Sequence, residues 1–187
     1  FFQRRAMALK STIYKIDLNI ADMDRQYYAQ HNLTLAKHPS ETDERVMVRL
    51  IGFALYANDA LTFGKGLSDD EEPDLWQKDL TGAIELWIDV GLPTEKDIRK
   101  ACGRSRQVMV MLYGGRIAEM WWDQNSKGLL KLNNLAVINL PETQELAGLA
   151  AKSINIACTI SDGEILVSND DGSFTIKPVI LKQPSTY

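Results

Sequence analysis

The sequence contains few of the residues that build zinc sites and disulfide frameworks, with two cysteines and two histidines among 187 residues. Cys102 and Cys158 lie far apart without metal-ligand spacing, so we interpret them as reduced thiols. His31 and His38 are too few for a His-rich zinc site. The sequence also lacks the ~20-residue apolar run that would span a bilayer and an N-terminal signal segment. We therefore expect a cytoplasmic protein with no membrane segment.

An excess of basic residues is also missing, since the formal net charge is -4. This balance argues against attraction to nucleic acid over the whole surface, although it is compatible with a local basic patch. The length predicts a single domain, which we assign to residues 7–187. Because Met7 begins the stretch MALKSTIYK, we interpret residues 1–6, FFQRRA, as an extension or an expression remnant.

The N-terminal third of the chain changes from strand periodicity to helix periodicity. Apolar and polar residues alternate over 14–20, which predicts a strand, and residues 26–37 follow as its hairpin partner. Apolar residues at helical spacing then predict a helix over 41–57, with Ser40 as its N-cap.

Strands and helices alternate in the middle of the chain, and hairpins end it. The expected elements after the first helix are strand 82–91, helix 94–103, strand 108–113, helix 116–125, strand 130–140 and helix 142–153. A C-terminal β-meander follows, with turns at Asp162-Gly163 and Asp171-Gly172. The order predicts a mixed α/β (α+β) fold, a central mixed sheet flanked by helices with antiparallel hairpins at both ends.

Two carboxylates near the predicted strand 82–91 are candidate metal ligands. Asp74 follows the rigid Pro73, and Asp89 lies near the end of the strand. Mg²⁺ in proteins takes one or two carboxylates, with waters and substrate phosphate completing its shell. Glu85 shares a strand face with Asp89, but four strand residues separate them by about 13 Å, too far to share one ion. The opposite face, Ile84, Leu86, Ile88 and Val90, is expected in the core.

Basic residues gather on the predicted helix that follows this strand, in the stretch KDIRKACGRSR. Lys96 and Lys100 are four residues apart and therefore share a helix face that can point back at the strand end. A cation there could orient a phosphate, and Arg99 and Arg104 could contact the nucleic-acid backbone. The alternative is a solvated helix face whose C-terminal cations favour the helix dipole.

Several stretches of the chain resemble the YaeQ family of small bacterial proteins. The matching blocks are MALKSTIYK, LTLAKHPSETDERVMVRL, GLSDDEEPDLW, ELWIDVGLP, IRKAC and MWWDQN. The resemblance covers the chain from Met7 onward. That family is similar in fold to the PD-(D/E)XK nuclease superfamily, so the resemblance implies a restriction-endonuclease-like α/β arrangement.

The resemblance implies roles for individual residues. Asp74 and Asp89 would be the two acids that hold Mg²⁺ or Mn²⁺, and Glu41 a third acid from the first helix. The superfamily lysine is absent from its strand position, where Gly91 stands. Lys100, or else Lys96, on the next helix would replace it.

The sequence leaves three functions open. The first is a metal-dependent phosphodiesterase acting on nucleic acid, with Arg45 among the backbone contacts. The second is a non-catalytic nucleic-acid- or protein-binding regulatory module, favoured by the missing strand lysine and the acidic net charge. The third is a structural ion-pair network of the acids with Arg45 and Lys100. Because these alternatives differ in chemistry, the sequence leaves open whether the protein is an enzyme.

Overall fold

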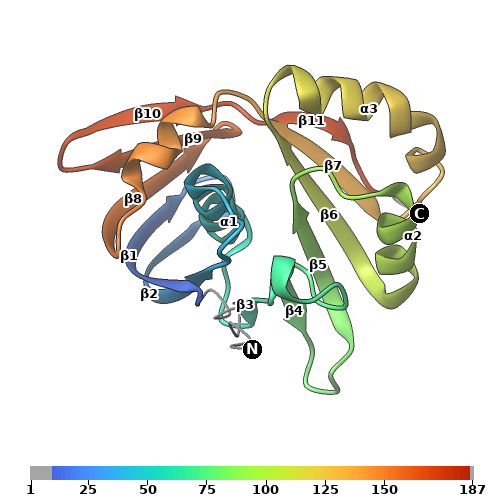
Figure 1. Ribbon diagram of the computed structural model, residues 1–187, viewed down its shortest axis with the longest axis horizontal. Helices are drawn as coiled ribbons and strands as arrows, with labels where there is room; N and C mark the ends of the chain where they lie inside the picture. The colour runs from blue at the N-terminus through green and yellow to red at the C-terminus, as the bar shows by residue number, and fades with distance from the viewer. Residues whose placement is uncertain (1–9, 186–187) are drawn as a thin grey trace, which may run out of the picture.

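Two β-sheets enclose one helix, and two further helices cover the outer face of the second sheet (Figure 1). This computed structural model describes residues 10–185, so residues 1–6, interpreted as an extension, lie outside the described residues. Within the described part of the chain no helix has the length and apolar character to cross a membrane. The mixed α/β class predicted from the sequence is confirmed.

The first sheet joins the two ends of the chain. Its strand order is β10-β9-β8-β1-β2, and its strands are β1 Thr12–Asp22, β2 Tyr27–Lys37, β8 Ser153–Ser161, β9 Glu164–Asn169 and β10 Gly172–Ile176. The predicted N-terminal hairpin is the β1–β2 pair. It meets the C-terminal meander through parallel pairing of β1 with β8. The two terminal hairpins therefore form one sheet, with a buried and a solvent-facing side.

The second sheet is the predicted central mixed sheet. Its order is β11-β7-β6-β5-β4-β3, and its strands are β3 Leu61–Phe63, β4 Leu75–Lys78, β5 Ile84–Val90, β6 Ser105–Tyr113, β7 Leu135–Leu140 and β11 Val179–Lys182. Strands β5, β6 and β7 are parallel, whereas β4 and β11 pair antiparallel. The alternation of strands and helices predicted this central part, because a parallel pair needs a crossover connection.

Helix α1, Asp43–Tyr56, lies between the two sheets, and residues 46–54 are buried without interruption. Residues from both sheets and from α1 form one apolar cluster. The helix begins later than predicted. Thr42 is the N-cap, and its hydroxyl accepts a hydrogen bond from the Arg45 amide. Glu41 therefore precedes the helix, which fixes its place in the site described below.

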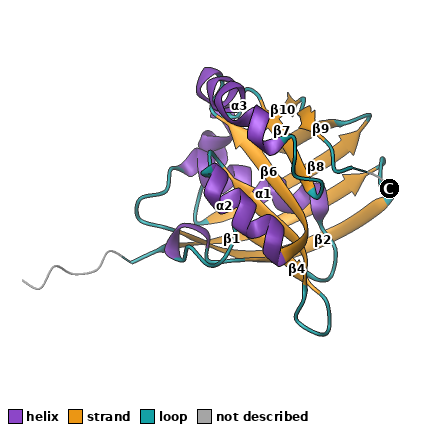
Figure 2. Cartoon of the chain, turned by 90° about the vertical axis from the view of Figure 1, so that its right-hand side faces the viewer, coloured by secondary structure: helices purple, strands orange, loops and turns teal. Residues whose placement is uncertain are grey.

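Helices α2, Glu95–Arg104, and α3, Arg116–Leu129, pack on the other face of the central sheet (Figure 2). Thr94 caps α2 as predicted, with its hydroxyl accepting from the Asp97 amide. Buried residues of α2, α3, β5, β6 and β7 make a second apolar cluster under these helices. The described residues also form two short 3₁₀ helices, η1, Gly66–Ser68, and η2, Gln144–Leu149.

Besides the start of α1, four predictions about the elements were wrong. The strand expected over 130–140 begins only at Leu135, because α3 continues to Leu129. The helix expected over 142–153 is only η2, because Ser153 and the residues after it extend to pair with β1. The last turn lies one residue earlier than expected, at 170–171, since Gly172 already pairs with Asn169. The final strand leaves the meander after Pro178, and β11 pairs with β7 in the other sheet.

The predicted core face of β5 is correct for Leu86, Ile88 and Val90. Ile84 instead packs with the α2 and α3 side. The reason is a register shift against β4, where Gln77 pairs with Leu86 but Lys78 pairs with Ile84. Such a bulge adds one residue to one strand and turns the side chains beyond it to the other face.

Candidate functional site

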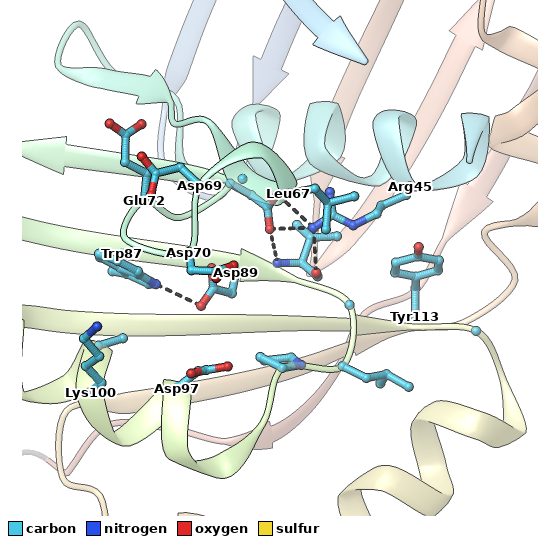
Figure 3. A pocket seen from close by; sticks show the side chains of 18 of the residues that line it. Arg45, Leu67, Asp69, Asp70, Glu72, Trp87, Asp89, Asp97, Lys100 and Tyr113 are labelled. Atoms are coloured by element: carbon cyan, nitrogen blue, oxygen red, sulfur yellow. Dashed lines mark hydrogen bonds and ion pairs between the residues drawn. The ribbon is translucent and has the colours of Figure 1, made fainter. Parts of the chain in front are cut away.

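Antiparallel pairing brings Asp74 and Asp89 together. Leu75 of β4 pairs with Ile88 of β5, so the next residues outward, Asp74 and Asp89, lie opposite each other. Both side chains line one cavity of about 670 Å³, and Figure 3 shows Asp89 in this cavity. The two acids selected from the sequence therefore lie in the same cavity of the fold.

Two glycines allow the chain to approach this corner closely. The Gly64 amide donates to the Asp74 carbonyl over 3.0 Å, and the Gly66 amide donates to the Pro73 carbonyl over 3.1 Å. A Cβ on Gly64 would overlap the Pro73 carbonyl oxygen. A Cβ on Gly66 would lie 2.6 Å from Asp74 Oδ1, and its φ of +51° is also one that side-chain-bearing residues rarely adopt. The stretch FGKGLS is thus shaped to pack against Asp74.

Asp74 is buried and forms an ion pair with Arg45. Arg45 Nη2 donates to its Oδ1 over 2.9 Å and its Oδ2 over 3.0 Å, and the Val90 amide donates to Oδ2 over 2.8 Å. Burial raises the pKa of Asp74, while Arg45 and the Val90 amide oppose that rise. The carboxylate is therefore stabilised by specific donors, as a buried charge must be.

Asp89 differs because it has no cationic partner within the described residues. Its Oδ2 accepts one hydrogen bond, from Trp87 Nε1 over 2.9 Å. Burial raises the pKa of Asp89 to about 7; the Trp87 hydrogen bond and Arg45 lower it, whereas the negative charges of Asp74 and Asp97 raise it further. This carboxyl group consequently titrates near neutral pH and has an oxygen, Oδ1, that accepts no hydrogen bond in the described chain.

Glu41 joins a buried chain of ion pairs behind the acid pair. It accepts from Arg45 Nη1 over 2.6 Å and from Arg49 Nη2 over 2.8 Å. Arg45 therefore lies between Glu41 and Asp74, with only 13% of its side chain exposed. Glu41 lines a separate cavity of about 260 Å³. The structure does not bring this residue, predicted as a third metal ligand, to the cavity of Asp74 and Asp89.

The cations of α2 divide between two sides of the helix. Lys100 and Arg104 line the cavity, and both pair with Glu71, which belongs to the acidic loop before β4. Arg99 instead pairs with Glu95 and donates to the Gly128 carbonyl of α3. Lys96 is exposed and does not line the cavity. Of the two lysines proposed for the site, the structure brings only Lys100 to its edge.

Comparison of the sequence with family models and with related proteins identifies the family to which the chain belongs. The family model described as YaeQ protein matches residues 7–178. The chain belongs to the YaeQ family. The protein named "Uncharacterized protein YaeQ" of Escherichia coli K12 is 40% identical over 181 residues, which are 96% of this chain and 100% of that protein. The protein of the same name from Salmonella typhi is also 40% identical, with the same coverage.

Two solved YaeQ structures share the architecture. The crystal structure of YaeQ protein from Xanthomonas axonopodis pv. citri is 49% identical, with a TM-score of 0.90 over 93% of this chain and 99% of that chain. The crystal structure of YaeQ protein from Pseudomonas syringae is 34% identical, with a TM-score of 0.88 over 92% and 97% of the two chains. The fold described above is thus the fold of the YaeQ family.

Sequence reasoning missed part of the YaeQ cavity. The acidic loop lines it with Asp69, Asp70 and Glu72, and the start of α2 contributes Asp97. The loop could have been found from its position, because it directly precedes Pro73 and Asp74. Tyr113, at the end of β6, carried no local signal, because only the parallel pairing of β5 with β6 brings it near Val90.

Proposed function

We propose that the cavity between β4, β5 and α2 is the site of a divalent-metal-dependent phosphodiesterase that acts on nucleic acid. The observation that carries this proposal is the pairing of two carboxylates: Asp89 is half-buried with no cationic partner among the described residues, and Asp74 lies opposite it. The central mixed sheet with helices on both faces is also compatible with the restriction-endonuclease-like fold and the PD-(D/E)XK likeness expected from the sequence.

The donor set fits a hard cation such as Mg²⁺ or Mn²⁺. The described residues contain no group of three or more His, Cys, Asp or Glu side chains that could hold a metal by themselves. Mg²⁺ does not need one, because it keeps several waters and takes one or two carboxylates. Asp89 Oδ1 is free of hydrogen bonds in the described chain, and Asp74 Oδ1 accepts only from Arg45. A carboxylate oxygen can accept twice, so each acid has capacity for a ligand bond. The bound ion would polarise a phosphate oxygen and lower the pKa of water.

Side chains of the protein would position the metal-binding acids and balance the negative charge of the substrate. Trp87 Nε1 fixes the rotamer of Asp89 through its hydrogen bond, so the free oxygen keeps one direction. Arg45 holds Asp74 in place from the far side. Lys100 and Arg104, at the cavity edge, would bind the phosphate backbone.

A second candidate, the non-catalytic binding module, has its own support. Arg45 already neutralises Asp74, and Lys100 is paired with Glu71 rather than directed at the acid pair. Gly91, at the strand position of the superfamily lysine, has a φ of +104° and cannot be replaced there without strain. A protein with this arrangement could bind a ligand in the cavity without turnover.

Calorimetric titration of Mg²⁺ and Mn²⁺ separates the candidates. We expect the wild-type protein to bind one ion, and Asp74→Ala and Asp89→Asn to lose that binding with the fold intact by circular dichroism. Glu85→Gln is the matched control, because Glu85 is on the same strand and pairs with Arg106 outside the cavity. Ion-dependent cleavage of labelled DNA or RNA that Asp89→Asn abolishes and Glu85→Gln retains would support the enzyme. Ion binding equal in all variants would refute the site.

A further inference from the structure

Two basic side chains of α2 form ion pairs with one carboxylate, each with a different oxygen of Glu71. Lys100 Nζ lies 2.6 Å from Glu71 Oε1, and Arg104 Nη1 lies 3.2 Å from Glu71 Oε2. Arg104 also donates to the Glu71 main-chain carbonyl over 3.3 Å. The two cations are one helical turn apart, so they form a fork that faces the loop of residues 69–72. A phosphate group can present two anionic oxygens to such a fork as a carboxylate does.

The charges lining the cavity do not suit a polyanion while this loop is in place. Six acidic residues line it, Asp69, Asp70, Glu72, Asp74, Asp89 and Asp97. Three basic residues oppose them, Arg45, Lys100 and Arg104. Half of the acids belong to the loop. Without the loop the remaining acidic and basic residues are equal in number, so removal of the loop changes the lining from negative to balanced.

The loop tip has few other contacts that hold it on the helix. The hydrogen bonds of residues 69–72 within the described chain, apart from those of Glu71 to α2, stay local. Glu71 N donates to Asp69 Oδ1, Glu72 N to the Asp69 carbonyl, Asp69 N to the Gly66 carbonyl, and Lys65 N to Glu72 Oε2. Lys65 Nζ also lies 3.9 Å from Asp69 Oδ2. The base of the loop is fixed by the two glycines that pack on Pro73 and Asp74. Release of Glu71 from the fork would therefore free the tip and leave the base in place.

We propose that the Lys100–Arg104 fork is a phosphate subsite of this cavity, and that Glu71 occupies it as an internal competitor until an anionic ligand displaces the loop. The inference rests on the proposed function for the nature of the ligand, and adds how the site is kept closed. Displacement uncovers both cations and removes the loop acids from the lining in one movement. The free-energy cost of breaking these ion pairs is small, because the Lys100 and Glu71 side chains are more than half exposed and Arg104 is 36% exposed, so solvent screens their attraction.

Inorganic tripolyphosphate in EDTA tests the subsite without nucleic acid and without metal. We expect Glu71→Gln to bind tripolyphosphate roughly threefold to tenfold more tightly than the wild type by calorimetry, the range expected for loss of two exposed ion pairs. Glu95→Gln is the matched control, since it makes the same charge change on an exposed ion pair of α2 outside the cavity. In the Glu71→Gln protein, Lys100→Gln and Arg104→Gln should each remove the gain. Amide hydrogen exchange of residues 66–72 should increase when tripolyphosphate binds the wild type.

Each result decides the inference separately from the enzyme. Equal affinities of Glu71→Gln and Glu95→Gln, a gain that survives loss of both cations, or no binding by any variant would overturn the subsite. The expected affinities without metal-dependent cleavage of any nucleic acid would support the subsite and reject the phosphodiesterase. Cleavage unaffected by Glu71→Gln, with equal tripolyphosphate affinities, would retain the enzyme and reject the internal competitor.

Discussion

Replacing Asp89 with asparagine in EDTA should stabilise the folded protein at alkaline pH and leave it unchanged in acid. The pKa of Asp89 is raised from 3.8 to about 7 by burial. Between these values the folded state keeps a proton that the unfolded state has released. The free energy of unfolding of the wild type therefore falls as the pH rises from about 4 to about 7, and stays level above 7.

The magnitude follows from the size of the displacement. Each pKa unit corresponds to about 1.4 kcal/mol, so the upper bound for the penalty at pH 8 is about 4 kcal/mol. Asp89 lines the cavity, and its side chain is only half-buried. Solvent therefore screens part of this penalty. We expect Asp89→Asn to be more stable than the wild type by about 1–2 kcal/mol at pH 8. The amide oxygen of asparagine can still accept from Trp87 Nε1, so the packing is retained.

Urea denaturation at pH 4.5, 6, 7 and 8 measures the effect. The difference between Asp89→Asn and the wild type should be smallest at pH 4.5 and grow to its full value by pH 8. Glu85→Gln, on the same strand but outside the cavity, should show no such pH dependence. A loss of stability in Asp89→Asn at pH 8, or a difference independent of pH, would refute the reasoning. Such a loss would instead mean that Asp89 belongs to a stabilising ion-pair network.

Three further outcomes are expected. Arg45→Met should destabilise the fold by about 3–5 kcal/mol in urea denaturation, because it leaves two buried carboxylates without their shared cation; an effect below 1 kcal/mol would contradict this. Gly66→Ala should cost more stability than Gly82→Ala, by about 1–2 kcal/mol in thermal unfolding, since both need positive φ but only Gly66 would contact Asp74 Oδ1. The Cys102 thiol, whose pKa burial raises to about 11, should react with a thiol reagent at pH 8 much more slowly than the unfolded chain does; equal rates would show that it is exposed.

Local chemistry explains which elements could be predicted from the sequence. Alternating side chains define β1, and a threonine hydroxyl at the right spacing defines the start of α2. The error at 142–153 has the opposite cause. Pro141 and the residues after it favour a helix start, but Ser153–Ser161 finds its partner in β1, more than 130 residues earlier. A contact at that distance along the chain leaves no local signal, so periodicity could not reveal it.

The same limit applies to the candidate site. Pro73-Asp74 and Asp89 could be selected because a strand end beside a polar loop is visible in the sequence, and the structure brings them together. The placement of Glu41 could not be predicted. It depends on whether the helix begins before or after this residue, and on which carboxylates Arg45 and Arg49 reach once α1 is buried between two sheets.

The charges of the acid pair and its arginine favour one divalent ion together with a phosphodiester. Asp74, Asp89 and Arg45 carry a net charge of about -1 when both acids are ionised. One divalent cation changes this to about +1, and a single phosphodiester group returns it to zero. A second arginine or a lysine beside Asp89 would neutralise the site without an ion. The absence of a cationic partner for Asp89 among the described residues therefore matters as much as the presence of Asp74. It makes ion binding and phosphate binding mutually dependent, so titrations of Mg²⁺ should show tighter binding when a non-hydrolysable phosphodiester is present. Equal Mg²⁺ affinity with and without that ligand would show that the two do not share this site.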